Sequence, residues 1–126
     1  KGLILKSSMV LAGKDAPQQS SPVEVAEATL RCLKNSVPEA VPGVVFLSGG
    51  QSPQQATENL NAIAQKGVQS WQLTFSYSRA LQEPALAAWQ GSEKNKEVAQ
   101  QALYKRASLN GAAREGRYTK DMEEHA

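Results

Sequence analysis

The sequence of 126 residues contains little of what marks several common protein classes. Its one cysteine, Cys32, excludes an internal disulfide framework, and its one histidine, His125, gives no metal-ligand spacing, so a metal or redox protein is disfavoured. No apolar run approaches the roughly 18 residues of a membrane-spanning helix. The net charge of +2 indicates neither a nucleic-acid nor a membrane partner. These features favour a protein of the reducing cytoplasm.

The sequence repeats one order of elements three times: a β-prone run, a loop and a helix. The β-prone runs are residues 2–10, 44–47 and 71–77, and the second is all-apolar, as in a strand buried on both faces. Two helices are expected after Ser21 and Ser52, where a serine N-cap precedes proline, and two more over residues 80–90 and 92–110. Three such units in series predict an α/β fold with parallel strands and right-handed crossovers.

Apolar spacing along the helices predicts the side chains that face the core. Trp71 and Trp89 are expected to be packing residues, and residues 111–126 a flexible tail with no core residue. The predicted inward residues are Val25, Ala28, Thr29 and Cys32 in the first helix, Ala56, Leu60, Ile63 and Ala64 in the second, and Val98, Ala102, Leu103 and Ala107 in the last.

Two architectures accommodate this order. One is a small open domain with a three-stranded sheet. The other is the last three units of a (β/α)₈ barrel, which needs about 250 residues in all. The chain begins inside an apolar run with no initiator methionine, so we expect a sequence cut from a longer one. Composition alone does not separate the two architectures.

All three predicted strands finish in reactive or anion-friendly residues. They are Lys6, then Ser48-Gly49-Gly50, then Ser76 to Arg79. In parallel α/β folds the carboxyl ends of the strands form the active site, so this edge of the sheet is the candidate site.

Lys6 interrupts an apolar strand and shares a face with Ile4. A desolvated ammonium loses its proton more readily, and a neutral amine is the nucleophile that forms a Schiff base with a ketone. The alternative is a lysine at a strand end whose stem lies on apolar surface and whose head reaches water.

Ser48-Gly49-Gly50 can bring backbone N–H groups close to an anion, and the helix that follows adds a favourable partial charge. Arg79 beside Ser76 and Ser78 offers a guanidinium fork suited to phosphate. The alternatives are a tight turn without a ligand and an ordinary surface arginine.

With these residues in place, the sequence resembles the C-terminal third of class I fructose-bisphosphate aldolase. The resemblance rests on three ordered segments: LKSSMV at residues 5–10, VPGVVFLSGGQS at 41–52 and LTFSYSRALQ at 73–82. It implies a (β/α)₈ barrel of which residues 1–126 are one part, from the sixth strand to the C-terminus. The tail resembles that of bacterial members.

The resemblance also implies an activity: a cytoplasmic lyase of glycolysis that cleaves fructose 1,6-bisphosphate without metal or cofactor and assembles as a homo-tetramer. Lys6 would form the imine, and Ser48, Gly49, Gly50, Ser76, Ser78 and Arg79 would bind the substrate phosphate.

The sequence departs from the family pattern at several points. Ser7-Ser8 replaces the usual Pro-Asn, and Ser78 replaces the usual glycine before the arginine. The C-terminal tyrosine of some members is absent, and the acid–base residues of earlier strands lie outside these 126 residues. We therefore expect the fragment alone to be inactive. A non-catalytic sugar-phosphate-binding module is the alternative function.

Overall fold

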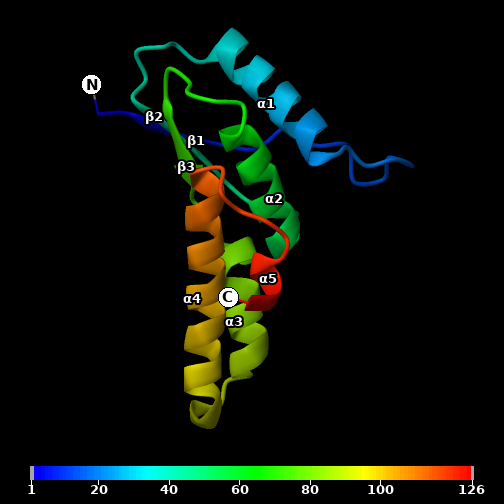
Figure 1. Cartoon of the computed structure of the whole chain (residues 1–126), viewed down its shortest axis with the longest axis vertical. Helices are drawn as coiled ribbons and strands as arrows, with labels where there is room; N and C mark the ends of the chain where they lie inside the picture. The colour runs from blue at the N-terminus through cyan, green and yellow to red at the C-terminus, as the bar shows by residue number, and fades with distance from the viewer. Residues whose placement is uncertain (1, 126) are drawn as a thin grey trace.

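The computed structural model describes residues 2–125, in which three parallel strands form one sheet with the order β1-β2-β3 (Figure 1). The strands are β1 (Ile4–Ser7), β2 (Gly43–Phe46) and β3 (Gln72–Phe75). Strands β1 and β3 are shorter than the predicted runs that contain them, and β2 has the predicted length but begins one residue earlier. The helices are α1 (Pro22–Ser36), α2 (Pro53–Ala64), α3 (Arg79–Trp89), α4 (Lys96–Arg114) and α5 (Met122–His125), with a 3₁₀ turn η1 (Glu93–Asn95) before α4.

The sheet has one covered and one open face. In register, Lys6 lies opposite Val45 and Val45 opposite Thr74, so these three residues share a face with Ile4. That face is only partly covered, and Ile4 is 63% exposed. The other face carries Val44 and Phe46, which are fully buried beneath the helices. Helices therefore cover the sheet face that carries Val44 and Phe46, whereas the face that carries Ile4 and Lys6 is open.

The starts of α1 and α2 confirm the predicted caps. Ser21 Oγ accepts a hydrogen bond from the Glu24 backbone N–H at 3.3 Å. Ser52 Oγ accepts one from the Gln55 N–H at 3.1 Å. In both helices the side chain at the third position reaches back to the cap, which completes a capping box.

In α1 the prediction for Cys32 is wrong, because this side chain is exposed. The larger hydrophobic residues Leu30 and Leu33 turn the buried stripe away from it. The buried residues of the helix are Val25, Ala26, Thr29, Leu30 and Leu33.

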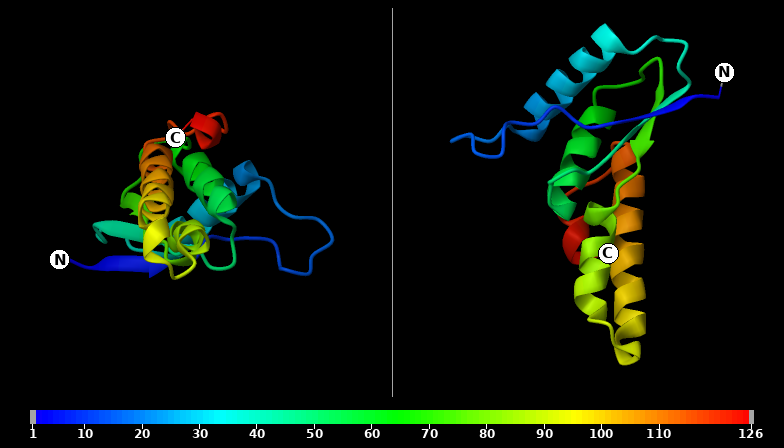
Figure 2. Two further views of the ribbon diagram at one scale, coloured as in Figure 1. Left: turned by 90° about the horizontal axis from the view of Figure 1, so that it is seen from below. Right: turned by 180° about the vertical axis from the view of Figure 1, so that it is seen from behind.

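The inward face predicted for the last helix is also wrong. Helices α3 and α4 run side by side as a hairpin that extends away from the sheet (Figures 1 and 2), and α3 is the main neighbour of α4. Val98, Leu103 and Ala107 are consequently exposed. The second half of α4 packs against α2 and β3, and its buried residues are Arg106, Leu109, Asn110, Ala112 and Ala113.

The expectation that residues 111–126 contain no core residue is corrected in the same region. Ala113 and Tyr118 are buried, and α4 continues to Arg114, four residues beyond its predicted end.

The two tryptophans, both expected to be packing residues, differ in burial. Trp71 is buried and its Nε1 donates to the Pro38 carbonyl at 3.0 Å, whereas Trp89 is 43% exposed at the hairpin.

Candidate functional site

The carboxyl ends of the three strands meet at one edge of the sheet, as the parallel order requires. Hydrogen bonds join the chain just beyond the strands. The Leu47 N–H donates to the Ser7 carbonyl at 2.9 Å, and the Ser76 N–H donates to the Phe46 carbonyl at 2.8 Å. The three predicted groups therefore follow neighbouring strands at the same edge.

Lys6 lies near the end of β1 with its side chain on the open sheet face. No helix of residues 2–125 covers this face, and Lys6 is exposed, so the burial expected for its side chain is not found. The sequence placed Lys6 among apolar neighbours along the strand, but Ile4 on the same face is exposed as well.

The glycine loop, Ser48-Gly49-Gly50, follows β2 and is held in place by buried polar side chains. Ser48 and Gln51 are both buried. Gln51 Nε2 donates to the Ser48 carbonyl at 3.1 Å, and Asn59 Nδ2 of α2 donates to Gln51 Oε1 at 2.7 Å. The loop is thus anchored to the second turn of α2.

The two glycines of this loop differ in conformation. Gly49 has a φ of +58°, which L-residues with a side chain rarely adopt. Gly50 has an ordinary φ, and a Cβ placed on it would meet no atom within 4 Å. The backbone at Gly50 is therefore open to the approach of a ligand.

The loop after β3 meets the glycine loop through Ser48. Ser48 Oγ accepts a hydrogen bond from the Ala80 N–H, at the start of α3, at 3.4 Å. Ser76 is half-buried, while Ser78 and Arg79 are exposed. The structure thus brings Ser48 beside the segment that contains Arg79.

Ser78 occupies the N-cap position of α3, where its side chain makes no capping hydrogen bond. Its carbonyl accepts the Gln82 N–H at 2.9 Å. The Ser78 hydroxyl is therefore not committed to the helix that it precedes.

Sequence reasoning missed Tyr77, which fixes the β3–α3 connection. The side chain is buried, and its hydroxyl donates to the Ala56 carbonyl of α2 at 2.9 Å. Burial raises the pKa of Tyr77 well above its ordinary value, so the hydroxyl remains a donor. The available signal was the alternation of Phe75 and Tyr77, whose rings lie 5.5 Å apart between centroids.

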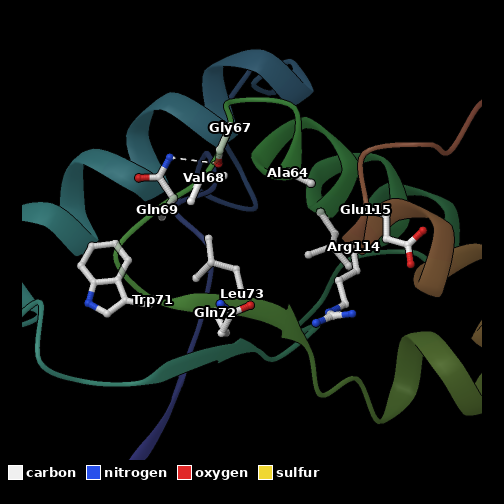
Figure 3. A pocket seen from close by; sticks show the side chains of 10 residues that line it. Ala64, Gly67, Val68, Gln69, Trp71, Gln72, Leu73, Arg114 and Glu115 are labelled. Atoms are coloured by element: carbon white, nitrogen blue, oxygen red, sulfur yellow. Dashed lines mark hydrogen bonds between the residues drawn. The ribbon is translucent and has the colours of Figure 1, made fainter.

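A cavity of about 390 Å³ lies at the opposite end of the strands, where β3 begins (Figure 3). Trp71 and Leu73 line one side of it, and Arg114 lines the other. None of the predicted site residues contributes to this cavity. The candidate site is therefore the edge formed by the strand ends, separate from this hollow.

Residues 2–125 contain no group of three or more His, Cys, Asp or Glu side chains arranged to hold a metal ion. In the same range, no helix combines the length and the apolar character needed to cross a membrane.

Comparisons with known proteins agree with this geometry. The family described as fructose-bisphosphate aldolase class-I matches residues 1–126. Fructose-bisphosphate aldolase B of Gallus gallus is 51% identical over 119 residues, 94% of this chain and 33% of that protein. The cytosolic fructose-bisphosphate aldolase 4 of Arabidopsis thaliana is 50% identical over 124 residues, 98% of this chain and 32% of that protein.

A solved structure of fructose-bisphosphate aldolase from Plasmodium falciparum, in complex with TRAP and a small-molecule inhibitor, superposes with a TM-score of 0.89. The two sequences are 46% identical, and the match covers 92% of this chain and 33% of the Plasmodium falciparum chain. The similarity confirms that the three strand–helix units are the last units of a (β/α)₈ barrel and excludes a separate open domain. The chain spans about a third of the length of the relatives that it matches. On this evidence the chain belongs to the class I fructose-bisphosphate aldolase family, a family of lyases.

Proposed function

We propose that the protein containing this chain reversibly cleaves fructose 1,6-bisphosphate to dihydroxyacetone phosphate and glyceraldehyde 3-phosphate, with Lys6 as the Schiff-base residue. The observation that carries the proposal is that Lys6 lies near the carboxyl end of β1 while the Ser48–Gly50 and Ser76–Arg79 segments follow β2 and β3 at the same edge of the sheet, in a chain of the aldolase family. The open sheet face that bears Lys6 is the face that the remaining strands of a barrel would enclose.

In this reaction the neutral Lys6 amine attacks the C2 ketone, and loss of water forms the protonated imine. When the C3–C4 bond breaks, its electron pair moves to the imine nitrogen and gives an enamine, while the C4 hydroxyl loses its proton to a base. The aldehyde product leaves, the enamine carbon takes up a proton, and water hydrolyses the imine to release the ketone. No metal or other cofactor enters these steps.

The substrate phosphate is proposed to bind to Ser48, Gly49 and Gly50 on one side and to Ser76, Ser78 and Arg79 on the other. Gly50 supports this assignment because its backbone is open to approach. The exposed Arg79 guanidinium supplies two parallel donors and a positive charge. Donors fixed before the substrate arrives bind an anion without a cost of reorganisation.

The base for this reaction is proposed to come from strands outside this chain. General acid–base assistance contributes about 10²–10⁴-fold to a rate, and the exposed Lys6 lacks an enclosing wall. We therefore propose that residues 1–126 alone have little or no aldolase activity. The whole enzyme is proposed to be a homo-tetramer. A cytoplasmic location is proposed as well, in line with the cytosolic relative in Arabidopsis thaliana.

Imine trapping tests the Lys6 assignment. The intact protein is incubated with dihydroxyacetone phosphate and reduced with borohydride, and the added mass is located by peptide mapping. We expect the adduct on Lys6, its loss in Lys6→Ala, and its retention in Lys14→Ala, which removes an exposed loop lysine. A folded intact protein with no adduct on Lys6 would contradict the assignment.

A non-catalytic sugar-phosphate-binding module is the second candidate, because the glycine loop is fully formed here while Lys6 is exposed. Phosphate binding without imine formation in the intact protein would support this second function.

A further inference from the structure

Arg106 of α4 is the one charged residue buried within residues 2–125, with 3% of its surface exposed. Its guanidinium donates to the Glu123 carboxylate at 2.6 Å and to the Pro53 carbonyl at 3.0 Å, and it also bonds to the Thr57 hydroxyl. A buried cation is stable only when such partners surround it. Arg106 therefore joins the segment after α4, residues 115–125, to the first turn of α2; this segment is called the C-terminal segment below.

Glu123 lies in α5, which packs beside α4 (Figure 1), and three groups hold it in place. Besides Arg106, the Tyr118 hydroxyl donates to its Oε1 at 2.9 Å, and Lys105 bonds to its backbone carbonyl. Burial, and after it the hydrogen bond to Glu123, raises the pKa of Tyr118, which keeps the hydroxyl protonated as a donor. The Tyr118 N–H also donates to Asn61 Oδ1, further along α2, so the Arg106–Glu123 pair is the contact that ties this segment to the start of α2.

The first turn of α2 is also the base of the glycine loop. Ser52, the N-cap of α2, follows Gln51 directly, and Pro53 is the first helical residue. Thr57 Oγ1 lies 2.9 Å from the Pro53 carbonyl to which Arg106 donates. One turn further along α2, Asn59 holds Gln51, and Gln51 holds the Ser48 carbonyl. The first two turns of α2 are thus connected to Ser48 through Gln51 and Asn59.

The same junction has room for movement. A cavity of about 280 Å³ is lined by Pro53, Pro84 of α3, Lys105 and Glu123, among others. Arg106 also lines this cavity, and its Nε is buried without a hydrogen-bond partner in the described structure. If Glu123 leaves, water can reach Arg106 and the contacts that fix Pro53 weaken.

We propose that Arg106 and Glu123 are positioning residues for the glycine loop: docking of Glu123 on Arg106 fixes the start of α2 and so orders the phosphate-binding backbone. The C-terminal segment thereby sets the affinity for phosphate without touching it. The identity of the ligand rests on the proposed function, but the mechanical connection does not.

Hydrogen exchange of the backbone amides tests the connection in the intact protein without any ligand. Glu123→Gln removes the charge and keeps the shape, while Glu124→Gln makes the same change at an exposed neighbour whose side chain has no hydrogen bond in the described structure. We expect Glu123→Gln to raise exchange over residues 48–57 by at least about tenfold. Residues 25–33 of α1, and the Glu124→Gln variant throughout, should exchange at the original rate.

Deletion of residues 122–126 gives a second variant, which exposes Arg106 to water instead of burying a new amide. It should reproduce the local rise in exchange. Unchanged exchange over residues 48–57 in both variants, or a rise of equal size in α1, would overturn the proposal.

Titration with inorganic phosphate separates this proposal from the proposed function. Glu123→Gln should weaken binding by about tenfold, and Glu124→Gln should leave it unchanged. An unchanged affinity in Glu123→Gln would overturn the positioning role. If the original protein binds no phosphate, the proposed site fails, and exchange alone then decides whether Glu123 orders the loop.

Discussion

The glycine loop allows backbone strain and ligand access to be separated by two neighbouring substitutions, Gly49→Ala and Gly50→Ala. Gly49 has a φ of +58°, where an L-residue with a Cβ costs about 1–2 kcal/mol. The new Cβ would lie 3.5 Å from Leu47 Cδ1, an ordinary contact that adds no clash. The decrease in the free energy of unfolding in Gly49→Ala should therefore come from the backbone conformation alone and amount to about 1–2 kcal/mol.

Gly50→Ala is the matched control for stability. Its φ is not in the left-handed region and its Cβ would enter open space, so we expect a change within about 0.5 kcal/mol of zero. In a barrel domain of about 250 residues, the loss of about 1–2 kcal/mol in Gly49→Ala corresponds to a Tm lower by roughly 2–8 °C.

Urea unfolding followed by circular dichroism measures both variants, with the slope m expected to stay constant. A Gly49→Ala variant as stable as the original protein, or a Gly50→Ala variant equally destabilised, would refute the reasoning. Phosphate titration then tests ligand access at Gly50, as urea unfolding tests backbone strain at Gly49. The methyl group of Gly50→Ala should weaken binding by at least about tenfold, because it occupies the approach to the backbone.

Three further predictions concern single side chains. Tyr77→Phe should lower the free energy of unfolding by about 1 kcal/mol through loss of the bond to Ala56. Because burial raises the pKa of Tyr77, the original protein should also lose stability above about pH 10, where the unfolded tyrosine ionises first, and Tyr77→Phe should lose less. Phe46→Ala should cost about 3–5 kcal/mol, since Phe46 is fully buried; a loss below 1 kcal/mol in urea unfolding would contradict its place in the core. Cys32, being exposed, should react with a thiol reagent in the native protein as fast as in urea, and strong protection would contradict its position.

The order of elements could be predicted from the sequence because its signals are local. Ser21-Pro22 and Ser52-Pro53 specify helix starts within a few residues, and the structure has both helices begin there. The apolar run at residues 44–47 specified a strand for the same reason, since its burial needs no knowledge of distant residues. The parallel order then placed the strand ends at one edge.

The burial of individual side chains could not be predicted in this way, because it depends on the packing of distant elements. Cys32 has the spacing of a buried residue, but Leu30 and Leu33 decide which side of α1 turns inward. Lys6 has apolar neighbours in sequence, yet its exposure depends on whether another layer covers the sheet.

Buried polar residues were missed for a related reason. Gln51, Asn59 and Arg106 read as solvent-facing in a sequence, because their burial requires partners that come from other elements. No local pattern encodes those pairings. The roles of Ser48, Gly49, Gly50, Ser76, Ser78 and Arg79 in phosphate binding remain predictions.

The open sheet face has a consequence for assembly. Val44 and Phe46 are already sealed beneath helices, whereas Ile4 and Lys6 await a covering layer. The outer sheet face is already covered, so a complementary partner would meet this polypeptide at its open sheet face and its two strand edges. We therefore predict that residues 1–126 supplied in trans complement a fragment that holds the preceding units of the barrel.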